Sequence, residues 1–132
     1  MSNAAEDAVG APKKYGPYSV VRKAGPFVFV SGQIGINPQT GAASADVSEQ
    51  TLQALANVAS ALGTVGLGLE HVVDTTVFLT NMADFEAVNK AYAGQFSEPY
   101  PSRACVGVAG LPHVGDVPLR VEIKVIAMEA AA

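Results

Sequence analysis

The strongest constraint on the fold comes from the alternation of side chains in residues 119–128, near the C-terminus. Every second residue there is apolar, and these residues would form one continuous face: Leu119, Val121, Ile123, Val125 and Ala127. The other face is mixed, since the charged residues Arg120, Glu122 and Lys124 are followed by Ile126 and Met128. A period of two predicts a β-strand that is fully covered on one side and partly covered on the other.

Two helical segments can cover the apolar face of that strand. Asp46 and Glu49 fit a capping box, and the apolar residues that follow are spaced by three or four: Leu52, Leu55, Val58, Leu62 and Val65. Asn81 can cap a second helix, whose apolar stripe is Phe85, Val88, Tyr92 and Phe96. Each segment therefore predicts an amphipathic helix with one buried side.

Further alternating runs predict the remaining strands, at residues 20–23, 27–30, 71–80 and 102–108. The order β-β-α-β-α-β-β indicates an α+β fold, with two helices on one face of a mixed, mostly antiparallel sheet. We expect the opposite face to carry Arg103, Cys105 and Glu122. That face is too polar for a core and too apolar to stay solvated, so we expect it to pack against another subunit and leave polar clefts.

Length and composition narrow the class of protein. The 132 residues predict a disordered segment at 1–13 and a single domain at 14–132. A net charge of −4 without a basic run argues against nucleic-acid binding. No apolar stretch approaches the ~20 residues of a membrane span, and the single Cys105 excludes a disulfide within the chain. With no secretory signal, these features favour the cytoplasm. His71 and His113 lack neighbours at ligand spacing, so no metal site is predicted.

Arg103 and Glu122 are the residues best suited to chemistry. The planar fork of an arginine fits a carboxylate, and a glutamate in a partly buried cleft can activate water. The residues alone leave other interpretations open: Arg103 and Glu122 can form a structural ion pair, or Glu122 can pair with Arg120 or Lys124 across a strand. Cys105 is better interpreted as a small buried apolar residue than as a nucleophile.

Several short segments resemble one known family. In chain order they are Gly16-Pro17-Tyr18-Ser19, Val30-Ser31-Gly32-Gln33-Ile34, Asn37-Pro38 with Thr40-Gly41, Asp74-Thr75-Thr76-Val77-Phe78-Leu79, Asp84-Phe85 with Val88-Asn89 and Tyr92, Pro101-Ser102-Arg103-Ala104-Cys105-Val106, Leu111-Pro112 and Val121-Glu122-Ile123. Together they resemble the RidA/YjgF family of reactive-intermediate deaminases, over about residues 16–127. The resemblance implies a chorismate-mutase-like fold and a homotrimer with clefts between adjacent subunits.

The resemblance also implies a reaction and its residues. It implies hydrolysis of 2-imino and 2-enamino acids to 2-oxo acids and ammonia without a cofactor, with Arg103 binding the substrate carboxylate and Glu122 activating water. The implied substrate-binding positions are Tyr18, Ser31, Gly32, Asn89 and Cys105. Asn89 can equally be a structural residue that ties a helix to a strand. The chain departs from the family pattern at Val20, Val21, Gly107 and Gly110, which we expect at the cleft rim, where they would affect substrate preference.

Two other functions compete with the deaminase. The same scaffold can serve as a non-catalytic module that binds small 2-oxo acids, which would keep Arg103 and not need Glu122. Some relatives carry a ribonuclease label, but the acidic balance and the lack of a basic, aromatic-rich face argue against that activity here.

Overall fold

The predicted order of strands and helices is confirmed in the computed structural model, which describes residues 12–129. The strands are β1 (Val21–Ala24), β2 (Phe27–Ile34), β3 (Val72–Leu79), β4 (Ser102–Gly107) and β5 (Val121–Met128). The helices are α2 (Val47–Gly63) and α3 (Phe85–Ala93), with short 3-10 turns η1 (Leu69–His71) and η2 (Met82–Asp84). Most of the segment expected to be disordered, 1–13, lies outside the described residues. Within 12–129, no helix is long and apolar enough to cross a membrane.

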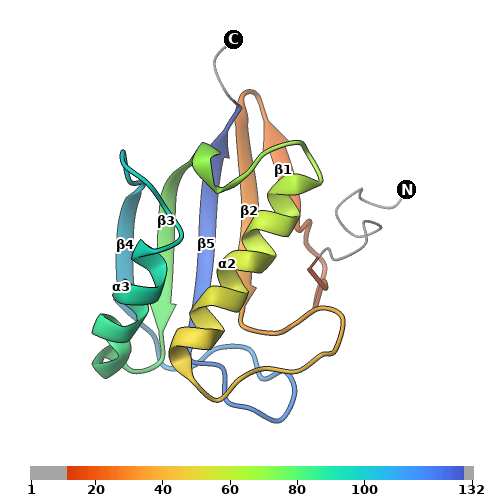
Figure 1. The fold of residues 1–132 in the computed structure, drawn as a ribbon. Helices are drawn as coiled ribbons and strands as arrows, with labels where there is room; N and C mark the ends of the chain where they lie inside the picture. Colours follow the sequence, from red (N-terminus) through yellow and green to blue (C-terminus); the bar gives the residue numbers. More distant parts are fainter. Residues whose placement is uncertain (1–11, 130–132) are drawn as a thin grey trace.

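The five strands form one sheet in the order β1-β2-β5-β3-β4. Only β3 and β4 run parallel, and the other neighbours are antiparallel. Helices α2 and α3 lie side by side over the same face of this sheet, with β4 and β1 at its two edges (Figure 1). The predicted α+β fold, with both helices on one face of a mixed sheet, is therefore confirmed.

The core lies between this sheet face and the two helices. On the central strand β5, the apolar face predicted from the alternation is completely buried from Val121 to Ala127. Helix α2 also buries three polar residues that the apolar stripe did not include: Gln50, Thr51 and Asn57. Gln50 donates to the carbonyls of Ser44 and Pro118 (2.8 and 3.0 Å), and Asn57 donates to the carbonyl of Ile34 (3.0 Å). Both side-chain amides donate to backbone carbonyls that would otherwise be buried without hydrogen-bond partners.

One predicted cap and one predicted strand face differ from the structure. The Asp46 carboxylate accepts from the Glu49 amide (3.1 Å), as the predicted capping box requires. The Asp46 amide, however, donates to Ser44 Oγ (3.1 Å), so the prediction that it donates to the Glu49 side chain is wrong. In β3, the register shifts between Val72 and Asp74. This irregularity exposes Val73, although strict alternation along the strand would place it on the same face as buried Thr75, because an extra residue reverses the alternation on one side of a bulge.

Candidate active site

Glu122 lies on the sheet face that the helices do not cover. Its neighbours along β5, Val121 and Ile123, point into the core, so the half-buried Glu122 side chain points the opposite way. Gly32 lies directly beside it, where the register of β2 against β5 shifts. An added Cβ at Gly32 would lie 2.7 Å from Cδ of Glu122, so the carboxyl packs directly over this glycine and a larger residue there would displace it. Burial raises the pKa of Glu122 above its usual value.

A small cavity opens beside Glu122. Its volume is about 160 Å³ and its lining residues are Lys13, Tyr15, Tyr18, Gly32, Gln33, Ile34, Pro112 and Glu122. The backbone amide of Tyr15 donates to the Tyr18 hydroxyl (3.0 Å), which ties the Tyr18 ring to the backbone of Tyr15. Ser31 does not line the cavity, and its hydroxyl donates to the Ser19 carbonyl (2.6 Å), next to Tyr18. The structure thus brings Tyr18, Gly32 and Glu122 together.

Arg103 and Cys105 lie on the other face of the sheet, so the prediction that they share a face with Glu122 is wrong. Strand β4 pairs with β3 so that Arg103 is opposite Thr75 and Cys105 is opposite Val77. Thr75 and Val77 are both buried under the helices, and paired residues point to the same side of a sheet. Alternation within β4 established that Arg103 and Cys105 share a face. The pairing with β3 determined which face it is.

The Arg103 guanidinium packs on aromatic rings of α3 instead of pairing with an acid. Its Cζ lies 4.9 Å from the ring centre of Tyr92 and 5.8 Å from that of Phe85. Among the described residues it has no ion pair, so neither Glu122 nor another carboxylate of this part of the chain occupies its N–H groups. Burial raises the pKa of the Cys105 thiol, and the nearby Arg103 charge partly opposes that shift.

Asn89 lies on the same stripe of α3 as Phe85 and Tyr92, four residues after one and three before the other. It is partly buried, and no hydrogen bond of its side chain joins it to the described residues. The interpretation that Asn89 ties the helix to a strand therefore has no support within residues 12–129. Its amide is available on the side of α3 that carries Arg103's aromatic contacts.

The cross-strand partners considered for Glu122 are also wrong. Arg120 binds Asp84 through two hydrogen bonds (2.7 and 3.2 Å) and donates to the Ala45 carbonyl (3.0 Å). Lys124 has no ion pair with Glu122 among the described residues. Arg120 therefore has a structural role, because it joins the start of β5 to the start of α3 and to the loop before α2.

The four departures from the family pattern fall in different environments. Val20 and Val21 are 0% and 7% exposed and belong to the core, so their expected place at a cleft rim is wrong. Gly107 faces Met82, whose Cγ would lie 3.2 Å from an added Cβ, whereas Gly110 has open space around it. Of these positions, Gly107 and Gly110 alone can influence a binding surface directly.

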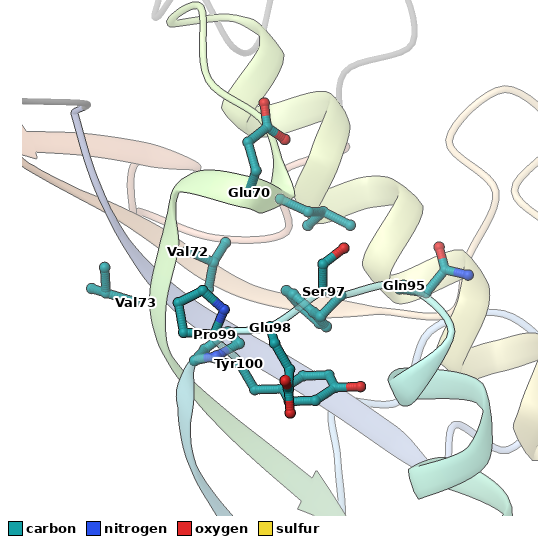
Figure 2. Close-up of a pocket in the computed structure, with 11 residues that line it drawn as sticks. Glu70, Val72, Val73, Gln95, Ser97, Glu98, Pro99 and Tyr100 are labelled. Carbon is teal, nitrogen blue, oxygen red and sulfur yellow. The ribbon is translucent and has the colours of Figure 1, made fainter.

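Another cavity contains none of the seven candidate residues. It measures about 420 Å³ and lies between η1 and the loop that follows α3, with Glu70, Glu98 and Tyr100 at its wall (Figure 2). Within residues 12–129, no group of three or more histidine, cysteine, aspartate or glutamate side chains could hold a metal ion. The candidate chemistry thus depends on two separate clusters, one around Glu122 and one around Arg103.

Residues missing from the sequence prediction include Lys13 in the Glu122 cluster and Thr75 beside Tyr92 in the Arg103 cluster. The Thr75 and Tyr92 hydroxyls are 2.9 Å apart in the core. A tyrosine in an otherwise apolar helical stripe is a signal that could have been noticed, because its hydroxyl needs a buried partner. No comparable sequence signal indicated Lys13.

Comparison with known proteins identifies the family to which the chain is similar. A family model described as endoribonuclease L-PSP matches residues 9–129. The chain is 43% identical over 113 residues to a RutC family protein of Pyrococcus horikoshii, covering 85% of this chain and 88% of that protein. It is 42% identical over 121 residues to the 2-iminobutanoate/2-iminopropanoate deaminase of Salmonella typhimurium, covering 89% and 91%.

Solved structures extend the comparison to the fold. The crystal structure of Escherichia coli TdcF with bound serine superposes with a TM-score of 0.85 at 38% identity, covering 94% of this chain and 97% of that one. This likeness confirms the chorismate-mutase-like fold that the sequence resemblance implied. By sequence and by fold, the chain belongs to the RidA/YjgF family, whose model is described as endoribonuclease L-PSP.

Proposed function

We propose that the protein hydrolyses 2-imino and 2-enamino acids to 2-oxo acids and ammonia, in clefts between the subunits of a homotrimer. The observation that carries this proposal is the position of Arg103 and Glu122 on opposite faces of one sheet, each without an ion pair among the described residues. Two such groups can act on one small substrate only when they come from different copies of the chain. Relatives of this chain are named imine deaminases.

The sheet face around Glu122 supports an assembly. This face exposes large apolar side chains at both ends, including Phe27, Val106 and Met128. An exposed apolar surface with charged residues at its margin is typical of a subunit interface. A second copy whose β4 edge approaches the Glu122 cavity would bring its own Arg103 and Asn89 next to Tyr18 and Glu122. The same contact repeated around a threefold axis would close a ring.

The reaction follows from these groups. Arg103 binds the substrate carboxylate through two parallel hydrogen bonds and fixes the imine carbon near Glu122. The Glu122 carboxylate takes a proton from a water molecule, whose oxygen bonds to the imine carbon while the C=N electron pair moves to nitrogen. Glu122 returns that proton to the nitrogen, which gives a carbinolamine. Glu122 then takes the hydroxyl proton of the carbinolamine and passes it to the amine, so the C–N bond breaks and ammonia leaves as the C=O bond of the 2-oxo acid forms. A raised pKa suits Glu122 to both accepting and returning a proton.

The first test is an assay of imine decay. A threonine/serine dehydratase would generate 2-aminoacrylate or its four-carbon homologue in solution, and the imine absorbance would be followed with wild-type protein, Arg103→Ala and Glu122→Ala. We expect faster decay with the wild type alone. If the folded wild type does not accelerate decay but binds 2-oxobutyrate, the non-catalytic binding module is the better description.

A mixing experiment tests whether the site is shared. Arg103→Ala and Glu122→Ala would be unfolded together at equal concentration and refolded. In a random mixture, about a quarter of the shared sites would combine an intact arginine with an intact glutamate, so activity should return to about that fraction. The control is Arg103→Ala refolded with the double variant, because no chain in that mixture carries an intact Arg103 and no site can regain both residues. Absence of recovery in the first mixture would contradict a shared site.

A further inference from the structure

We infer that Tyr92, held in place by Thr75, is a positioning residue that orients the Arg103 guanidinium for the substrate carboxylate. This inference rests on the proposed function and adds residues to it. Tyr92 is buried beneath the sheet edge, and the Arg103 Cζ lies 4.9 Å from its ring centre. Tyr92 itself is not expected to touch the substrate, so its effect on binding would act through Arg103.

The Tyr92 ring is fixed on three sides. Its hydroxyl hydrogen-bonds the Thr75 Oγ1 (2.9 Å) in the core, and its ring packs against Phe96 with 4.6 Å between centres and 37° between planes. Its ring face also contacts the guanidinium of Arg103. Thr75 and Arg103 are paired residues on β3 and β4, so the three side chains form a closed arrangement across helix and sheet.

This arrangement holds the arginine without using its hydrogen-bond donors. A guanidinium that lies on an aromatic face is attracted through its π-face, while its N–H groups point outward in the guanidinium plane. Phe85, two turns before Tyr92 on the same stripe of α3, extends the aromatic surface (5.8 Å). An acidic partner would instead compete with the substrate for the same N–H groups. The rings therefore orient the fork and leave it available to a carboxylate.

The test compares variants that remove either the ring or its anchor. Tyr92→Leu removes the ring beneath Arg103, whereas Tyr92→Phe and Thr75→Val remove only the buried hydrogen bond. Phe96→Leu is the matched comparison for Tyr92→Leu, because it removes an aromatic ring of the same stripe and leaves the ring beneath Arg103 in place. The dissociation constant of 2-oxobutyrate and the KM and kcat of imine hydrolysis would be measured on the full chain in its native assembly.

We expect Tyr92→Leu to weaken 2-oxobutyrate binding and raise KM by about 5- to 30-fold, the equivalent of a cation–π contact of about 1–2 kcal/mol. The change in kcat should be smaller, because the carboxylate is bound alike in the ground and transition states. Tyr92→Phe, Thr75→Val and Phe96→Leu each remove one support of the Tyr92 ring but keep a ring beneath Arg103, so each should show a smaller rise in KM. In an Arg103→Ala background, Tyr92→Leu should not weaken binding further.

A ligand-free measurement separates this inference from the proposed function. The Arg103 side-chain resonances should be shifted upfield by the Tyr92 ring in the wild type and lose that shift in Tyr92→Leu. If wild type binds 2-oxobutyrate and Tyr92→Leu binds it equally well, the positioning role is wrong and the proposed function stands. If the ring shift is present but wild type neither binds 2-oxobutyrate nor hydrolyses imines, the proposed function fails, and the inference fails with it.

Discussion

Two arginines of this protein, Arg120 and Arg103, are held in opposite ways. The N–H groups of Arg120 donate to other groups of the protein, with Nη2 2.7 Å from the Asp84 carboxylate and Nη1 3.0 Å from the Ala45 carbonyl. Arg103 is held by the faces of Tyr92 and Phe85, with no ion pair among residues 12–129. The partner, and not the residue type, determines whether a guanidinium serves stability or remains available for a ligand.

The difference has an energetic consequence. A partly buried arginine paired with a carboxylate leaves an uncompensated charge when either side chain is removed. A guanidinium packed on rings at an exposed edge leaves no such charge, because its donors already face water. Arg120 should therefore matter for folding and Arg103 for binding, and the predictions below test that separation.

The largest effect is expected for Arg103→Ala. Loss of two charge-assisted hydrogen bonds to the substrate carboxylate should lower kcat/KM for imine hydrolysis by about 10²–10⁴-fold. The free energy of unfolding should change by less than about 1 kcal/mol. Steady-state kinetics and urea unfolding of the same preparation would check both values. A large loss of stability would mean that the two arginines do not differ in the way proposed.

The complementary variant is Arg120→Ala. We expect a loss of about 1–3 kcal/mol in the free energy of unfolding, reduced from a fully buried pair because the Arg120 side chain is 35% exposed. Asp84→Ala should lose a similar amount, and the double variant should lose less than the sum of the two. Urea unfolding midpoints of the three variants provide the measurement. Additive losses would show that the pair contributes little as a pair.

Lysine substitution sharpens the comparison further. Lysine keeps the charge but lacks the planar fork and the stacking face. Arg103→Lys should therefore lower kcat/KM by roughly 10-fold, with most of the change in KM. Arg120→Lys should cost about 1 kcal/mol of stability and leave KM unchanged. Equal KM values for Arg103→Lys and wild type would show that charge alone suffices at that position.

The smallest effect concerns Glu122, the other candidate residue without an ion pair. Burial raises its pKa in the folded state above the unfolded value of about 4.3. The folded state therefore holds this proton more tightly, and the associated stability is present below about pH 4.3 and lost as the pH rises through the folded pKa. Glu122→Gln does not titrate, so it should gain stability relative to wild type between pH 4 and pH 7.5. Urea midpoints at both pH values would test the sign, and a constant difference would contradict it.

Most of the fold could be predicted because the spacing of apolar residues along the chain shows which side chains the core buries. The alternation in β5 and the apolar stripes of α2 and α3 each gave the correct element, since these patterns depend on the face that the core covers. The bulge at Val73 could not be predicted in this way, because a single inserted residue reverses the alternation without a change in composition. Burial of Gln50 and Asn57 was also missed, because their hydrogen-bond partners are distant in sequence.

The sequence by itself determined the α+β order, the buried face of β5 and the shared face of Arg103 and Cys105, because each is a property of local repeats. Only the tertiary structure decided that this shared face is the helix side, because strand pairing and not alternation orients β4. Only the tertiary structure placed Gly32 against Glu122 and Arg103 on Tyr92. Those contacts join residues far apart in the chain, and no local pattern encodes them.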